Sequence, residues 1–239
     1  MAVPKALERI TDMVWELPVS YKEGMRVPAR IYGTEKLIQE MDGGQDTLVL
    51  GIPRGGLVVA DEVAKALSAT LDVIIARKLR APDQPELGIG AVVNGDHIII
   101  NEDLSRAVGA SKEYLDREIV HQKEEIERRL RFYRKEHPAP EVSGKTIIVV
   151  DDGIATGYTF RAALESLRKR QPGRLVAAAP VAAQDSAEML KTFADEVVCL
   201  HTPAPFFAVG AWYQNFDQVS DEEAARILHL NWSRRPQAA

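Results

Sequence analysis

The chain has 239 residues, of which 46% are hydrophobic and 27% charged, and its formal net charge is −5 at pH 7. This length suits one large core or one domain with an appendage, and the charge gives no overall attraction for nucleic acid, although a local basic patch could still bind RNA. No apolar run approaches the about 20 residues of a membrane span, and the start has no secretory leader, so we expect a cytoplasmic protein without a membrane segment. The one cysteine, Cys199, excludes an internal disulfide and a cysteine cluster for zinc.

Residues 1–45 are predicted to form an N-terminal arm outside the main domain, because prolines and the Gly43-Gly44 pair interrupt them. Residues 13–41 resemble the opening of RtcB-type RNA-splicing ligases, which share a Trp-Glu-(Ile/Leu)-Pro stretch and an Arg-Val-Pro-x-Arg-Ile-Tyr stretch. No ligase active-site cysteine or metal-binding histidine cluster accompanies this stretch, so the resemblance does not imply ligase activity. The alternative is an arm that packs on the domain or on a second subunit.

The main domain, residues 46–239, opens with a predicted strand, turn and helix over residues 48–67. The strand TLVLGI leads into the turn Pro53-Arg54-Gly55-Gly56. Gly55 and Gly56 allow backbone geometries that other residues resist, and the guanidinium of Arg54 offers several donors to a phosphate pair. An Arg-Gly-Gly turn is a weak signal when it stands alone.

A second strand is predicted over residues 71–76, ending at Arg77 and Lys78 and followed by a polar segment, residues 81–87. Basic residues at the carboxyl end of such a strand face the crevice where open α/β sheets bind ligands. A solvated basic edge is the alternative. Further on, Asn94-Gly95 between two apolar stretches predicts a two-residue β-hairpin.

Residues 111–137 predict a long, highly charged helix that Ser111 caps and Pro138 ends. Its narrow apolar stripe favours a packing surface or a subunit seam, so a homodimer is conceivable. The basic side chains of this helix could contact RNA, but the glutamates between them favour a solvated face.

The stretch 145–159, KTIIVVDDGIATGYT, carries the most chemistry in the chain. Its β-branched run predicts a strand buried on both faces, and a helix pattern follows the small-residue turn. Backbone N–H groups at a helix start bind anions, whereas Asp151 and Asp152 accept hydrogen bonds from sugar hydroxyls or hold a hydrated cation. The combination predicts a site for a phosphorylated sugar, the alternative being an ordinary turn with solvated carboxylates.

This stretch resembles the phosphoribosyl-diphosphate (PRPP) motif of type I phosphoribosyltransferases: an apolar strand, two acidic residues, two variable residues, a small residue, then Thr-Gly-x-Thr. The resemblance implies that Asp151 and Asp152 hold the ribose hydroxyls and bind Mg²⁺, directly or through water. It implies a set of residues for the 5-phosphate and ribose: Asp151, Asp152, Gly153, Ala155, Thr156, Gly157, Tyr158 and Thr159. Tyr158 replaces the usual glycine, and Ala155 replaces the Asp that accepts a proton in members acting on 6-oxopurines, which argues against hypoxanthine or guanine as acceptor.

The same resemblance implies a pyrophosphate site formed by Arg54, Gly55, Gly56, Arg77 and Lys78. It implies that Arg54, Lys78, Asp151 and Asp152 carry the catalytic roles. It also implies a non-proline cis peptide near Arg54-Gly55 and a mobile catalytic loop at residues 81–87.

Strands over 174–181 and 196–200, with a helix over 185–193 that Asp185 and Glu188 cap, complete an α/β domain with a doubly wound parallel sheet. The tail, mainly residues 201–230, is rich in aromatic residues and corresponds to the hood that covers the sheet's carboxyl edge in this family. Ser220 and Glu223 are expected to cap its last helix. The predicted acceptor-binding residues are Phe207, Trp212 and Tyr213.

The resemblance to type I phosphoribosyltransferases implies an enzyme that transfers the 5-phosphoribosyl group of PRPP to a nitrogen acceptor and releases pyrophosphate, with Mg²⁺ as cofactor. The alternative is a regulatory or RNA-binding module that senses PRPP or a nucleotide in the same site without turnover. The five histidines show no metal-ligand spacing and receive no role.

Overall fold

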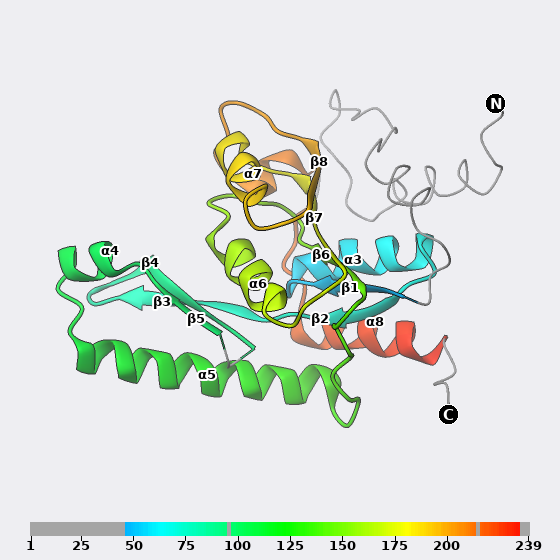
Figure 1. The fold of residues 1–239 in the computed structure, drawn as a ribbon, viewed down its shortest axis with the longest axis horizontal. Helices are drawn as coiled ribbons and strands as arrows, with labels where there is room; N and C mark the ends of the chain where they lie inside the picture. Colours follow the sequence, from blue (N-terminus) through cyan, green and yellow to red (C-terminus); the bar gives the residue numbers. More distant parts are fainter. Residues whose placement is uncertain (1–45, 95–96, 214–215, 235–239) are drawn as a thin grey trace.

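A parallel five-stranded sheet forms the centre of the computed structural model, which describes residues 46–94, 97–213 and 216–234 (Figure 1). The strand order is β2-β1-β6-β7-β8. These strands are β1 (Thr47–Gly51), β2 (Thr70–Val73), β6 (Thr146–Val150), β7 (Arg174–Val181) and β8 (Glu196–His201). The predicted N-terminal arm, with its ligase-like residues 13–41, lies outside the described residues.

Helices cover both faces of this sheet. The two layers contain α3 (Gly55–Ala66) and α8 (Asp221–Ser233) on one face and α6 (Tyr158–Arg168) and α7 (Gln184–Leu190) on the other. The strands alternate between them: Val49 and Ile148 join the core of the first face, whereas Leu48 and Ile147 join that of the second. Because both of their faces are buried, β1, β6 and β7 are largely apolar. The predicted doubly wound α/β fold is thereby confirmed.

A second, antiparallel sheet, β3-β4-β5, projects from one side of the molecule above a long helix (Figure 1). Its elements are β3 (Ala76–Ala81), β4 (Gln84–Val93) and β5 (His97–Ile100), with α4 (Glu102–Ala107) and α5 (Lys112–Arg134) following. Val93 pairs with His97, so a hairpin joins β4 and β5 as predicted, but three residues lie between the paired positions where a two-residue turn was expected. The predicted long helix is confirmed as well, and the Ser111 side chain accepts a hydrogen bond from the Tyr114 N–H at 3.2 Å.

The prediction of one strand over residues 71–76 was wrong. The chain leaves the parallel sheet after Val73 and begins β3 at Ala76, so Arg77 and Lys78 lie inside an antiparallel strand. The apolar residues Ile74 and Ile75 bridge the two strands and conceal the break. The segment 81–87, expected as a loop, forms a tight turn and the start of β4, with Ala81 paired to Gln84.

The predicted cap of the helix after β7 was also wrong, because α7 begins at Gln184 and Ala183 occupies the cap position without a side-chain hydrogen bond. Asp185 therefore lies in the first turn of the helix. At α8 the expected cap is present, since Ser220 Oγ accepts a hydrogen bond from the Glu223 N–H at 3.0 Å.

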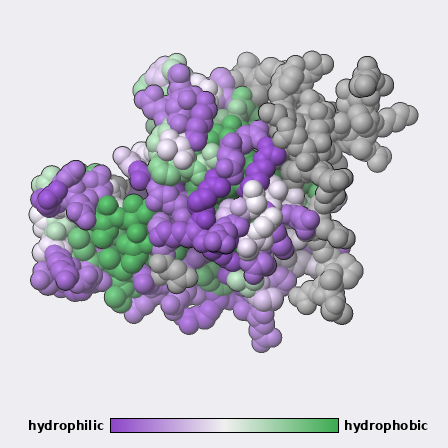
Figure 2. Space-filling model, viewed as in Figure 1, coloured by the Kyte–Doolittle hydropathy of each residue, from purple (hydrophilic) through white to green (hydrophobic). Residues whose placement is uncertain are grey.

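An apolar surface covers the projecting sheet, where Figure 2 shows a green patch over β3–β5. Partly buried side chains of this region, among them Ile98, Ile100 and Leu104, pack against the core of the first face. The homodimer considered from the sequence stays a prediction.

Side chains of α8 close the outer edge of β2. The N–H of Leu71 donates to Asn231 Oδ1 at 3.2 Å, and Trp232 Nε1 donates to the Leu71 carbonyl at 2.8 Å. Arg134 of α5 adds hydrogen bonds to Asp72 Oδ1 at 3.1 Å and to the Val73 carbonyl at 3.2 Å. The backbone groups of an edge strand, which otherwise invite pairing with another chain, are thus satisfied within the domain.

Asn231→Ala is expected to lower the free energy of unfolding by about 1–3 kcal/mol, because it leaves the buried Leu71 N–H without a partner. The measurement is urea denaturation followed by circular dichroism. Ser233→Ala is the control, since this exposed hydroxyl donates within its own helix, to the Leu230 carbonyl. Equal denaturation midpoints for the two variants would contradict the role given to Asn231.

Candidate functional site

Two turns meet at the carboxyl edge of the parallel sheet, one after β1 and one after β6. The strands pair in register, and the Ile52 N–H donates to the Val150 carbonyl at 2.8 Å just beyond them. A Cβ on Gly55 would lie 1.8 Å from Asp152 Oδ2, and a Cβ on Gly56 would lie 2.8 Å from the Asp151 Cα. The turn therefore needs both glycines in order to pack against the aspartate pair. The Pro53–Arg54 peptide is cis, one residue before the predicted position.

Asp151 and Asp152 are partly buried at the bottom of this junction. Burial raises the pKa of both carboxyls, and the charge of Asp152 raises the pKa of Asp151 further. Asp151 Oδ1 accepts a hydrogen bond from the Asp152 N–H at 2.9 Å, which favours its ionised form but does not offset burial. A ligand that brings positive charge or hydroxyl donors would stabilise both carboxylates.

The donor set at this pair fits a magnesium ion that shares its coordination with a ligand. Among the residues that the structure describes, no group of three or more His, Cys, Asp or Glu is arranged to hold a metal. Mg²⁺ commonly keeps several waters and binds through one or two carboxylates together with substrate phosphates. Asp151 and Asp152 would supply those carboxylates.

The turn after Asp152 forms an exposed loop that opens α6. Gly157 caps this helix with φ 73°, a left-handed conformation that favours glycine. Ala155, Thr156 and Tyr158 are exposed around it. Ser186 of α7, which no motif in the chain singles out, donates from Oγ to the Ala155 carbonyl at 2.5 Å and braces the loop from outside. The first N–H groups of α6 thus follow an exposed, supported loop, an arrangement that can bind an anion.

The basic strand β3 lies across from this loop. Thr159 lines a pocket of about 230 Å³ together with Arg77, Lys78 and Arg80. Lys78 and Arg80 are exposed, whereas Arg77 is half-buried and donates from Nε to Gln122 Oε1 at 2.8 Å. Although the strand assignment was wrong, Arg77 and Lys78 do lie beside the predicted phosphate loop. Arg80 was not among the predicted site residues.

A larger pocket, of about 620 Å³, lies between the Arg54 turn and the tail. Its walls include Arg54 and Asp152 on one side and Tyr213, Phe216 and Glu223 on the other. The Tyr213 side chain is only 3% exposed, and its hydroxyl donates to the Asp152 carbonyl. The tail is therefore fastened directly to the aspartate pair.

The structure separates the three predicted acceptor-binding residues. Tyr213 lines the larger pocket. Trp212 instead packs against Phe206 and His201, with ring centroids 6.4 and 5.1 Å away, and Phe207 is 85% exposed. Phe216, which was not predicted, lines the pocket and is 47% exposed. The clustering of aromatic residues indicated the segment but not which of its rings face the pocket.

No helix in the described ranges is both long and apolar enough to cross a membrane.

Asp151→Asn is expected to raise the free energy of unfolding by about 1 kcal/mol at pH 7–8 in EDTA. The pKa of Asp151 is raised in the native protein. Its protonated form therefore stabilises the native protein fully below the unfolded pKa, and this stability is lost as pH rises through the native pKa. Asn resembles the protonated carboxyl and does not lose this stability. The difference between variant and native protein should therefore vanish below about pH 4.

Chemical denaturation at several pH values measures this difference, with Asp116→Asn on the exposed side of α5 as control. A variant at Asp151 that is less stable than the native protein at pH 8 would refute the argument.

Known proteins with similar sequences or structures match most of the chain. Residues 33–215 match the family model described as phosphoribosyl transferase domain. Rv0571c of Mycobacterium tuberculosis, provisionally named a phosphoribosyl transferase, is 42% identical over 185 residues, which are 77% of this chain and 42% of that protein, so the chain spans less than half of this relative. The crystal structure of TT1426 from Thermus thermophilus superimposes with a TM-score of 0.67 and 40% identity, covering 83% of this chain and 95% of that one.

A separate, short match is to the tRNA-splicing ligase RtcB of Methanocaldococcus jannaschii, with 56% identity over 36 residues, 15% of this chain and 4% of the ligase. It agrees with the resemblance seen in the sequence and extends no further along the ligase. The match to the family model, in contrast, covers most of the chain and includes both turns of the site. The chain therefore belongs to the phosphoribosyl transferase domain family.

Proposed function

We propose that this protein transfers the 5-phosphoribosyl group of PRPP to a nitrogen acceptor and releases pyrophosphate. The observation that carries the proposal is the junction of the Arg54-Gly55-Gly56 turn with the Asp151-Asp152 pair, because one ligand must then present anionic groups and sugar hydroxyls within a few ångströms of each other. PRPP has this distribution: a ribose with a phosphate at one end and a diphosphate at the other.

In this proposal the 5-phosphate binds at the start of α6. The backbone N–H groups of residues 155–159 and the hydroxyls of Thr156 and Thr159 donate to its oxygens. The ribose 2- and 3-hydroxyls donate to Asp151 and Asp152, the partly buried carboxylates beneath the loop.

The leaving diphosphate binds Arg54, the Gly55-Gly56 backbone, Arg77 and Lys78. When the bond from C1 to the leaving oxygen lengthens, negative charge grows on the diphosphate and positive charge on the ribose. The guanidinium and ammonium groups stabilise the first, and the carboxylates stabilise the second. Asp151 and Asp152 would hold Mg²⁺, directly or through water, and the ion would neutralise part of the diphosphate charge.

The acceptor binds in the larger pocket, where Tyr213 and Phe216 form the wall opposite Arg54 and Asp152. The acceptor nitrogen attacks C1 with its lone pair, and its proton leaves afterwards. Ala155 offers no side chain to take that proton, so it must pass to water or to a neighbouring group. This favours acceptors that do not need a base at position 155, and it disfavours 6-oxopurines.

Isothermal titration with PRPP and Mg²⁺ tests the binding step. We expect binding to release protons, because the pKa of both carboxyls is raised in the free protein and the ligand stabilises their ionised forms. The affinity should therefore increase as pH rises through the native pKa values, and the observed enthalpy should differ between buffers of different ionisation enthalpy.

The Asp151→Asn, Asp152→Asn double variant is expected to bind at least about tenfold more weakly, the loss of one charge-assisted contact or more. No binding by the native protein, or equal binding by the double variant, would overturn the assignment.

Pyrophosphate release from PRPP across a panel of purine, pyrimidine and pyridine bases tests the transfer step. Release that depends on one added base is the expected result. Binding of PRPP without release for any base would instead favour a sensing role for the same site.

A further inference from the structure

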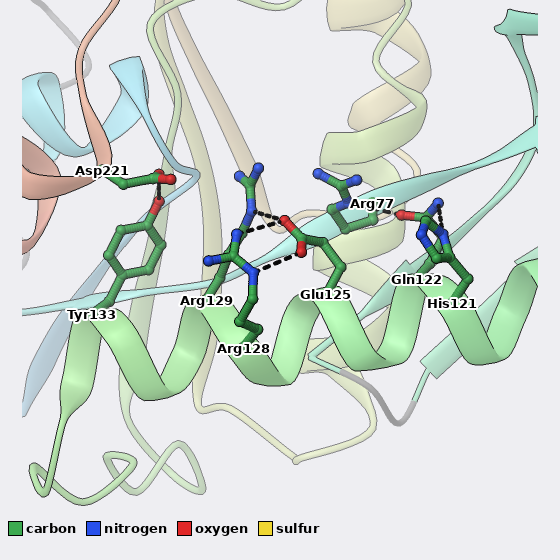
Figure 3. Close-up of polar contacts among 8 residues, drawn as sticks. All are labelled: Arg77, His121, Gln122, Glu125, Arg128, Arg129, Tyr133 and Asp221. Carbon is green, nitrogen blue, oxygen red and sulfur yellow. Dashed lines mark hydrogen bonds and ion pairs between the residues drawn. The ribbon is translucent and has the colours of Figure 1, made fainter.

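One face of α5 is turned toward the site instead of toward solvent. Gln122, Glu125, Arg129 and Tyr133 follow one another at three- and four-residue spacings along this face (Figure 3). Gln122 accepts the hydrogen bond from Arg77, and the Tyr133 hydroxyl donates to Asp221 Oδ1 at 2.5 Å. The helix expected to present a solvated charged face thus contacts a predicted site residue directly.

Arg129 and Arg128 share one partner but differ in their surroundings. Both donate to Glu125, Arg128 through two nitrogens and Arg129 through Nε at 2.8 Å. The Arg128 side chain is 58% exposed, whereas that of Arg129 is 22% exposed. Figure 3 shows the terminal nitrogens of Arg129 and Arg77 pointing away from α5 toward the same side. Within the described part of the chain, no hydrogen bond engages those terminal nitrogens of Arg129.

The charge of Arg129 acts on groups at or near both predicted pyrophosphate-binding elements, the basic strand β3 and the Arg54 turn. Burial lowers the pKa of Arg77, and the nearby charge of Arg129 lowers it further. Burial and the bond to Asp221 raise the pKa of Tyr133, while the charges of Arg129 and Arg54 act in the opposite direction. The charge of Arg129 therefore acts on Arg77 and also on the Tyr133 hydroxyl. The charge of Arg54 acts on the same hydroxyl.

Three guanidinium groups in one region repel one another unless an anion lies among them. Glu125 supplies one negative charge but already pairs with Arg128 as well, and the charge of Glu118 also reaches Arg77. A diphosphate carries several charges and enough oxygens to accept from more than one guanidinium fork.

We propose that Arg129 is a further binding residue for the diphosphate of the phosphoribosyl donor, held in place by Glu125 between Arg54 and Arg77. This rests on the proposed function, since it adds a residue to the same donor site. It gives the long helix a part in binding, because α5 then contributes one contact directly through Arg129 and one indirectly by holding Arg77 through Gln122.

Titration with inorganic pyrophosphate and Mg²⁺ at low salt tests the proposal. Arg129→Gln is expected to weaken pyrophosphate binding about 10- to 100-fold, the equivalent of one charge-assisted contact. Arg128→Gln is the matched control, since it removes the neighbouring partner of Glu125 from the exposed side, and it should remain within about twofold of the native protein. Circular dichroism and thermal melts establish that each variant is folded.

Equal affinities of Arg129→Gln and Arg128→Gln, with a loss in Arg54→Gln, would overturn the role of Arg129 and leave the proposed function standing. A native protein that binds neither pyrophosphate nor PRPP would overturn both. If Arg129→Gln does not fold, Arg129→Lys keeps the charge but loses the planar fork, and it should bind about three- to tenfold more weakly. Unchanged affinity in that variant would overturn the proposal.

Discussion

The contact between the Gly55-Gly56 turn and the Asp151-Asp152 pair depends on the pairing of β1 with β6. The two strands are hydrogen-bonded in register from Thr47 and Thr146 onward, so their carboxyl ends finish at the same level. A slip of one residue would turn the apolar side chains of a strand to the wrong layer and would also separate the two turns. The buried layers on both faces of the sheet therefore hold the geometry of the site as well as the fold.

The native protein holds two adjacent carboxyls, Asp151 and Asp152, in a partly buried position. Burial disfavours ionisation of both carboxyls, and the two glycines of the neighbouring turn pack closely against them. A neutral residue would be tolerated better by the fold alone. Sites that bind charged ligands commonly carry such local strain, which ligand binding relieves.

Much of the fold could be predicted because its signals are local. Strands buried on both faces read as continuous apolar runs, and Ser111, Ser220 and Asn94 marked helix starts and a hairpin correctly. The break between β2 and β3 could not be seen, because Ile74 and Ile75 continue the apolar run across it. Apolar character alone does not distinguish a strand that ends from one that changes partners.

The site divides in the same way. Each of its two turns is one continuous stretch of sequence, so each was recognisable as a motif. Residues that support or line it through distant contacts were not: Ser186 contacts Ala155 from another helix, and Phe216 reaches the larger pocket from an irregular tail. Such contacts depend on how the helices and the tail pack on the sheet, which a pattern along the chain does not contain.

The hydrogen bond from the Tyr213 hydroxyl to the Asp152 carbonyl constrains how this family member could diversify. It joins the tail to the backbone of the turn against which Gly55 and Gly56 pack. A change in the tail that suits a different acceptor would also shift Asp152, which is proposed to hold the ribose. New acceptor preferences would then arise more readily at Phe216, on the open side of the pocket, than at the tyrosine that anchors the tail.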